Sequence, residues 1–157
     1  MKRVIYILVA ILICFGIGYT ANLFQSEPLE TWYPMLIKSE LTPPNYVFPV
    51  AWSIIYVCSG ISIGLVWNKR ETLDSGLAWI FILQLVFNFA WSLLFFYLQD
   101  PFSGLIDLIL LDLTVLFYVI TCYRINKVSA WLFAPYILWL ILATYLNTFI
   151  VINNPIM

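Results

Sequence analysis

Tryptophan and carboxamide side chains recur at helical spacing inside the apolar segments of this 157-residue chain. Residues three or four positions apart share one face of a helix, so four faces that mix aromatic and polar groups are predicted. These faces comprise Trp52, Tyr56 and Gly60; Gln84, Asn88, Trp91 and Phe95; Asp107, Leu111, Thr114 and Tyr118; and Pro135, Trp139, Ala143 and Asn147. Aromatic walls with a few convergent polar groups are typical of ligand sites, so the spacing predicts a binding pocket.

The same side chains also have a structural interpretation. The three amides of the set are Gln84, Asn88 and Asn147. Each could instead join two helices through a hydrogen bond of about 0.6–2 kcal/mol. For these three residues the sequence supports the pocket and the helix-joining role equally. Three indoles at similar depths on polar faces favour the pocket over simple bundle packing.

The ionisable residues give no conventional catalytic group. The chain has no histidine, which excludes His-ligated haem, His-containing zinc sites and His acid–base catalysis, and no metal site is predicted. Asp107 is expected to accept hydrogen bonds from the helix N-terminus near Ser103 and Gly104. Asp112 lies in the middle of an apolar segment, where a carboxyl group needs a proton or a partner.

The elements that carry these residues must lie in a membrane. Hydrophobic residues make up 64% of the chain, charged residues only 10%, and the mean hydropathy is +0.98. Soluble domains average about 25% charged residues, and a chain of this length has too little interior to bury so much apolar surface. The three cysteines lie singly in apolar runs, and no basic cluster suggests nucleic acid as a partner.

Five apolar segments are long enough to cross a bilayer as helices. They are residues 4–24, 46–67, 77–97, 104–123 and 128–152. The sequence therefore predicts an all-α integral membrane protein, a bundle of five transmembrane helices that forms one domain over residues 1–157. A pair of glycines in the second segment, Gly60 and Gly64, would let another helix approach closely, from the same chain or from a second copy.

Positive charge predicts the orientation of the chain. Six Lys and Arg residues flank one side of the predicted spans (Lys2, Arg3, Lys69, Arg70, Arg124 and Lys127), and only Lys38 lies on the other. The positive-inside rule then predicts a multi-pass protein of the cell membrane with a cytoplasmic N-terminus. The C-terminus and the first loop, residues 25–45, are expected outside. Trp67, Trp79 and Trp131 are expected at the cytoplasmic boundary as an interfacial belt.

The first loop leads into the second span through a proline-rich stretch. Pro43 and Pro44 disfavour helix before them, and Pro49 is tolerated in a first helical turn, so the helix is expected to begin abruptly near Tyr46 or Phe48. A stiff entrance of this kind would hold Trp32 and Tyr33 above Trp52. The loop is therefore predicted to be the lid of the pocket.

Five motifs, in order along the chain, resemble the TspO/MBR family of tryptophan-rich sensory proteins, whose animal members are the translocator protein or peripheral benzodiazepine receptor. They are WYPMLIK (32–38), TPPNYVFPVAWSIIY (42–56), QLVFNFAWSLLFF (84–96), Asp107 in the fourth span, and PYILWLILATYLN (135–147). Two departures are evident. Pro49-Val50 stands where the family usually has Gly-Pro, and no Tyr, Lys or Arg follows Asn147, so the animal-type cholesterol motif is absent there.

The resemblance implies a bundle, often a homodimer, that requires no cofactor and binds tetrapyrroles such as protoporphyrin IX. The same pocket is implied to take isoquinoline-carboxamide and benzodiazepine drugs. Carried over by position, the ligand-binding residues are Trp32, Tyr33, Trp52, Tyr56, Gln84, Asn88, Trp91, Trp139, Ala143 and Asn147. Trp52 and Trp139 are implied to be the reactive pair in a light-dependent oxidative breakdown of porphyrin.

Three functions follow as hypotheses. A receptor or scavenger of tetrapyrroles leads, since the predicted pocket and the resemblance agree. A transporter of porphyrin or lipid is the first alternative, although the chain shows no inverted repeat of the kind that alternating access uses. A membrane stress protein that regulates partner proteins is the second. Whether the light-dependent reaction makes the chain an enzyme is left open, because no nucleophile with a base is present.

Overall fold

The computed structural model describes residues 2–69 and 75–154 and confirms an all-helical membrane bundle. Arg70, one of the residues used for orientation, lies outside this range. The long helices are α1 (Lys2–Thr31), α2 (Val47–Lys69), α3 (Ser75–Ser92), α4 (Pro101–Ile125) and α6 (Ala134–Asn153). Three short elements join them: the 3-10 turn η1 (Tyr33–Met35), the π-helical turn η2 (Leu93–Tyr97) and α5 (Lys127–Trp131). In the described residues, five segments are long and apolar enough to cross a membrane.

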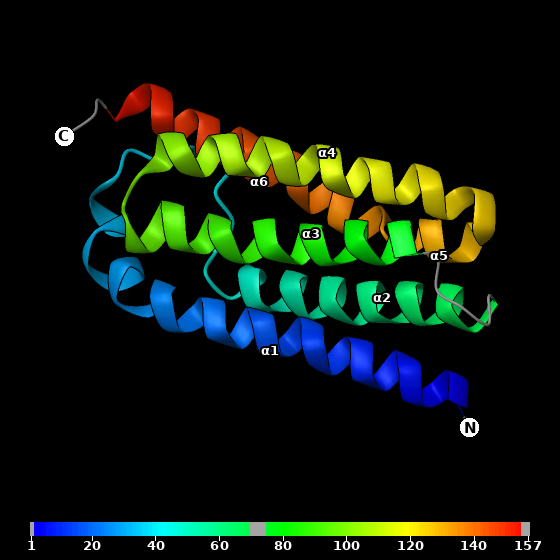
Figure 1. The fold of residues 1–157 in the computed structure, drawn as a ribbon. Helices are drawn as coiled ribbons and strands as arrows, with labels where there is room; N and C mark the ends of the chain where they lie inside the picture. The colour runs from blue at the N-terminus through cyan, green and yellow to red at the C-terminus, as the bar shows by residue number, and fades with distance from the viewer. Residues whose placement is uncertain (1, 70–74, 155–157) are drawn as a thin grey trace.

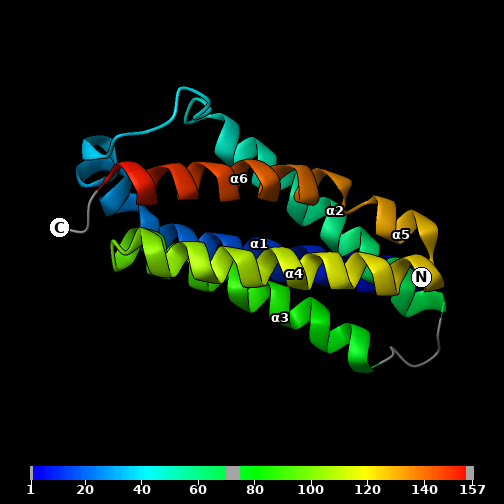
Figure 2. The ribbon, with the colours of Figure 1, turned by 90° about the horizontal axis from the view of Figure 1, so that it is seen from above.

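The helices run in alternating directions along one common axis (Figure 1). The segment between α1 and α2, residues 32–46, lies at the same end of the bundle as the C-terminus, and we call this the loop end. Seen from above, α6 and α2 lie on one side, α3 on the other, and α1 and α4 between them (Figure 2). This arrangement surrounds a space near the loop end with α1, α2, α3, α4 and α6.

The first helix is longer than predicted. The expected loop 25–45 is wrong at its start, because residues 25–31 continue α1. Pro28 has no N–H to donate to the carbonyl of Phe24, so one helical hydrogen bond is lost there. The helical bonding resumes after it, because the Trp32 N–H donates to the Pro28 carbonyl at 3.0 Å. Leu29 packs against a buried aromatic cluster at the loop end, so tertiary contact offsets the lost hydrogen bond. The predicted start of the second helix is confirmed, since α2 begins at Val47.

Two further spans contain irregularities that hydropathy did not indicate. The expected continuous helix over 128–152 is interrupted by a turn between α5 and α6. Pro135 lies in the first turn of α6 and supplies no N–H to the preceding turn, which explains the break. In the third span, Leu98 N–H bonds to the Leu93 carbonyl at 2.9 Å, five residues back, so α3 widens into the π-helical turn η2.

The two glycines of α2 face α1 of the same chain. A β-carbon at Gly60 would lie 2.7 Å from the backbone nitrogen of Ile11, and one at Gly64 would lie 2.9 Å from the Cα of Ile7. Real β-carbons do not approach atoms so closely, so only glycine permits this contact. The pair therefore joins α1 and α2 at the end of the bundle opposite the loop.

This contact predicts a large cost for a single methyl group. Gly60→Ala should lower the free energy of unfolding in detergent by about 1–3 kcal/mol, because the backbones of α1 and α2 must separate. Gly16→Ala is the matched control, since a β-carbon there meets no atom within 4 Å. It should leave stability unchanged or raise it by up to about 1 kcal/mol through helix propensity. Equal effects of the two changes would contradict the glycine contact.

Candidate functional site

A cavity of about 700 Å³ lies at the loop end of the bundle. Its walls come from α1, α2, α3, η2, α4 and α6, with Tyr33 from η1 and Asn45 from the segment before α2. Aromatic side chains dominate the walls: Phe15, Tyr19, Tyr33, Phe48, Trp52, Tyr56, Trp91, Phe95, Phe96 and Trp139. This volume lies within the range of about 300–1,000 Å³ that small-molecule sites occupy.

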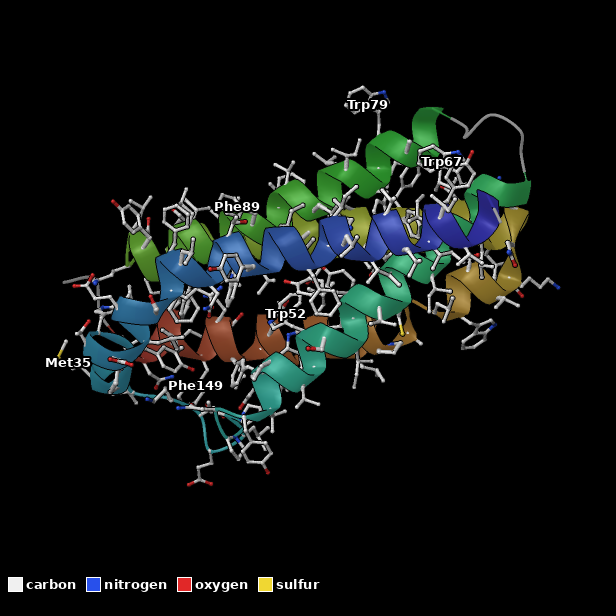
Figure 3. All side chains as sticks on the ribbon, turned by 90° about the horizontal axis from the view of Figure 1, so that it is seen from below. Met35, Trp52, Trp67, Trp79, Phe89 and Phe149 are labelled. Carbon is white, nitrogen blue, oxygen red and sulfur yellow. The ribbon has the colours of Figure 1, made fainter. Side chains whose placement is uncertain are left out.

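Two tryptophans from different helices meet on one wall. The ring of Trp52 in α2 stacks on Tyr56 at 5.5 Å between centroids and meets Trp139 of α6 at 6.3 Å, with planes 73° apart. Phe48 packs edge-on against Trp139 at 5.4 Å. Figure 3 shows Trp52 inside the bundle, between the ribbons of α1 and α2. The wall thus offers aromatic faces in two orientations to a molecule in the cavity.

The third tryptophan of the cavity is fixed by a hydrogen-bond chain. Trp91 Nε1 donates to the Asn147 side-chain oxygen at 3.0 Å, and the Asn147 amide donates to the Pro101 carbonyl at 2.8 Å. The chain connects α3, α6 and the start of α4. The Trp91 ring also stacks on Phe95 at 5.2 Å, so both its edge and its face are fixed.

Two of the three amides, Asn88 and Asn147, hold helices together and line the cavity at the same time. The Asn88 side chain donates to the Tyr136 hydroxyl at 3.0 Å and joins α3 to α6. Asn88 and Asn147 are 5% and 2% exposed, and both are cavity-lining residues. The two interpretations that the sequence left open both describe these residues, because a bonded amide can still present an edge to the cavity.

Eight of the ten residues expected in the site line the cavity: Tyr33, Trp52, Tyr56, Asn88, Trp91, Trp139, Ala143 and Asn147. Trp32 and Gln84 do not. Trp32 packs edge-on against Phe95 at 5.6 Å, behind the wall. Gln84 is 1% exposed, and its amide nitrogen has no hydrogen-bond partner among the described residues. Gln84 shares the face of Asn88 but lies one turn further from the loop end, beyond the cavity.

The expected role of Asp107 is wrong. Asp100 caps α4 instead, accepting bonds from the backbone N–H groups of Phe102 and Ser103 at 3.1 Å each. The hydrogen bonds from Ser103, first from its side chain, lower the pKa of the Asp100 carboxyl. Asp107 lies too far along the helix to reach free N–H groups, and its Oδ2 has no hydrogen-bond partner among the described residues. The partner that the sequence did not identify for Asp112 is Thr144, whose hydroxyl donates at 2.7 Å.

Residues 32–46 border the cavity at two residues, Tyr33 and Asn45, and are bonded to α6 and to Asn154. Tyr33 lines the cavity, and burial raises the pKa of its phenol. The Asn154 side chain accepts from the Ile37 N–H at 2.9 Å and donates to the Ile37 carbonyl at 3.0 Å. Ser39 and Tyr145 share a hydrogen bond of 3.1 Å. The segment is therefore held in place by named contacts.

Sequence reasoning missed the residues that α1 contributes. Asn22, Gln25, Ser26 and Glu30 line the cavity, and Gln25 also donates to the Ser92 hydroxyl at 2.7 Å. Their spacing of three and four residues was a helical signal. The signal crosses the predicted end of the first span at residue 24, where the turn and charge residues of SEPLE (26–30) indicated a loop, so Asn22 was not joined to the three residues that follow it.

The structure defines a polytopic α-helical membrane protein with an internal aromatic cavity. Comparison with known proteins identifies the family: the TspO/MBR profile matches residues 10–152, and the chain belongs to that family. It is similar to the tryptophan-rich protein TspO of Archaeoglobus fulgidus, at 36% identity over 97% of this chain and 99% of the relative. It is also similar to the human translocator protein, at 30% identity over 74% and 70%. The tryptophan-rich sensory protein of Cereibacter sphaeroides is 30% identical over 75% and 73%.

The Asn147 chain gives a second prediction. Asn147→Leu should lower the free energy of unfolding by about 1–2 kcal/mol, because Trp91 and the Pro101 carbonyl both lose a partner that lipid cannot replace. Asn153→Leu is the control on the same helix, since among the described residues the Asn153 side chain bonds only to the Phe149 carbonyl within α6. Its effect should stay within about 0.5 kcal/mol. Equal losses, measured by unfolding in detergent, would show that Asn147 does not join the helices.

Proposed function

We propose that the chain binds a flat, largely apolar molecule of the tetrapyrrole class, represented by protoporphyrin IX, and serves in the membrane as its receptor or scavenger. The observation that carries this proposal is the cavity, where Trp52, Trp91 and Trp139 face a space of about 700 Å³. Indole rings match a planar macrocycle in shape and add a polar N–H. Isoquinoline-carboxamide and benzodiazepine ligands share this flat, aromatic character and are proposed for the same cavity.

The names of two relatives support a role that depends on a ligand or a cargo. The human relative is called a translocator protein, and the Cereibacter sphaeroides relative a sensory protein. For this chain we place sensing or scavenging first, and transport of porphyrin or lipid second. The regulation of partner proteins is the third candidate. We further propose that the protein lies in the cell membrane with a cytoplasmic N-terminus, as the distribution of Lys and Arg indicates. A homodimer is proposed as well, because the family resemblance implies one.

A light-dependent reaction of the bound porphyrin is a further candidate, and the contact between Trp52 and Trp139 favours it. Their centroids lie 6.3 Å apart on the cavity wall. In this reaction the bound porphyrin is the reductant, dioxygen is the oxidant and light supplies the energy. The two indoles would hold the ring and pass single electrons between the porphyrin and dioxygen.

The first test is equilibrium binding in detergent. Protoporphyrin IX should quench tryptophan fluorescence saturably, and Trp139→Ala should weaken the affinity about tenfold, because one aromatic contact with the ring is lost. Trp79→Ala is the control, because Trp79 is 68% exposed and projects away from the bundle (Figure 3). It should leave the affinity unchanged. Absence of saturable binding to the wild-type protein would contradict the proposed function and favour partner regulation.

A separate test addresses the light-dependent reaction. The double variant Trp52→Phe/Trp139→Phe should still bind protoporphyrin IX, because phenyl rings keep aromatic faces in the cavity. Illumination in air should bleach the bound porphyrin in the wild-type protein and much less in the variant. Equal bleaching rates would remove the two indoles from the reaction. Flux of porphyrin across proteoliposome membranes, measured separately, would favour the transporter.

A further inference from the structure

The ring of Tyr56 bounds the deep end of the cavity, away from the loop end. Counted from the loop end, Tyr56 is the last of the described residues of α2 that line the cavity. Tyr56 is 9% exposed, and its ring stacks on Trp52 at 5.5 Å and packs edge-on against Phe15 at 5.4 Å. The position of this ring therefore limits how far a bound molecule can extend along the axis of the bundle.

The same ring lies directly against a glycine of the first helix. Gly18 is itself a cavity-lining residue, and a β-carbon built on it would lie 2.7 Å from Tyr56 Cζ and 2.6 Å from the hydroxyl oxygen. The ring carbon Cε2 would be closer still. Real β-carbons do not approach other atoms so closely, so any side chain at position 18 must displace its neighbour.

The nature of this neighbour distinguishes Gly18 from the glycines that join α1 to α2. A β-carbon at Gly60 would meet backbone atoms of Ile11, so a methyl group there must separate the helices. At Gly18 the three nearest atoms all belong to the outer part of one side chain. A side chain can rotate, and Tyr56 borders open space in the cavity. A methyl group at position 18 is therefore expected to push the ring into the cavity.

We infer that Gly18 sets the depth of the cavity, because it leaves room for the Tyr56 ring beside α1, and that this depth admits large planar ligands. The inference rests on the proposed function and refines it. A tetrapyrrole is wide and rigid, so it cannot bend around a displaced ring. An isoquinoline-carboxamide is smaller and can remain nearer the loop end. Gly18 is thus a positioning residue that acts on ligand size through Tyr56.

The test compares the affinities of a large and a small ligand. Binding of protoporphyrin IX and of an isoquinoline-carboxamide is followed by tryptophan quenching in detergent, for the wild-type protein and for Gly18→Ala. The variant should bind protoporphyrin IX about tenfold more weakly and the smaller ligand within about twofold of the wild type, because only the larger ligand needs the occupied space. Gly16→Ala is the matched control on the same helix, since a β-carbon there meets no atom within 4 Å. It should change neither affinity.

A shorter side chain at position 56 separates positioning from general helix packing. Tyr56→Leu removes all three atoms that the new methyl group would meet, whereas Tyr56→Phe removes only the hydroxyl oxygen. Gly18→Ala should therefore weaken protoporphyrin IX binding about tenfold in the Tyr56→Phe background and less than about twofold in the Tyr56→Leu background. Each double variant is compared with its own Tyr56 single variant, so that direct contacts of Tyr56 with the ligand cancel.

Three results would overturn the inference. The first is an equal loss of affinity for both ligands, together with a loss of stability in detergent like that of Gly60→Ala, which would show that Gly18 only joins helices. The second is a tenfold loss that persists in the Tyr56→Leu background, since Tyr56 would then not be the displaced group. The third is an unchanged ratio of affinities in Gly18→Ala.

The proposed function and the inference can fail separately. If the wild-type protein binds protoporphyrin IX saturably and Gly18→Ala leaves the ratio of affinities unchanged, the inference fails and the proposed function stands. If protoporphyrin IX does not bind the wild-type protein saturably, the proposed function fails, and the inference fails with it because it requires a large ligand. Selective loss of protoporphyrin IX binding in Gly18→Ala, restored by the Tyr56→Leu background, would support both.

Discussion

Lipid offers no hydrogen bonds, and this constraint governs both the fold and the cavity. Backbone groups within the membrane must bond to one another, which requires helices, and polar side chains must find partners inside the bundle. Asn147 satisfies this demand by bonding to Trp91 on one side and to the Pro101 carbonyl on the other. Because these bonds also fix the Trp91 ring, the rule that stabilises the bundle also shapes the wall of the cavity.

Close packing at one end produces space at the other. The two glycines of α2 let α1 approach until backbone atoms are nearly in contact, at the end opposite the loop. Two straight helices that touch at one end and cross at an angle must separate at the other. The aromatic side chains of Phe48, Trp52 and Trp139 extend into the resulting space without filling it. The cavity is therefore a consequence of helix geometry, and its volume does not require a flexible lid.

The loop end gains its rigidity from side-chain bonds to α6. Asn154 holds the backbone of Ile37 from both sides, and Ser39 bonds to Tyr145. Together these contacts fix the segment that carries Tyr33. Among the described residues, no hydrogen bond of this kind joins the second half of α1 to the beginning of α2, where the exposed lining residues Asn22, Ser26 and Ser53 lie.

The sequence by itself determined the membrane class, the number of spans and eight of the residues on the cavity wall, among them all three of its tryptophans. Apolar length specifies spans, and helical spacing places Trp52 with Tyr56, and Asn88 with Trp91, on common faces. Only the tertiary structure decided the rest. Contacts at the loop end carry α1 through Pro28, so that Glu30 reaches the cavity from a helix, whereas local rules ended the helix earlier. Gln84 shares the face of Asn88, and Trp32 directly precedes Tyr33, yet both lie outside the cavity. The extent of the cavity depends on how five helices separate along their length, and no single helix encodes that.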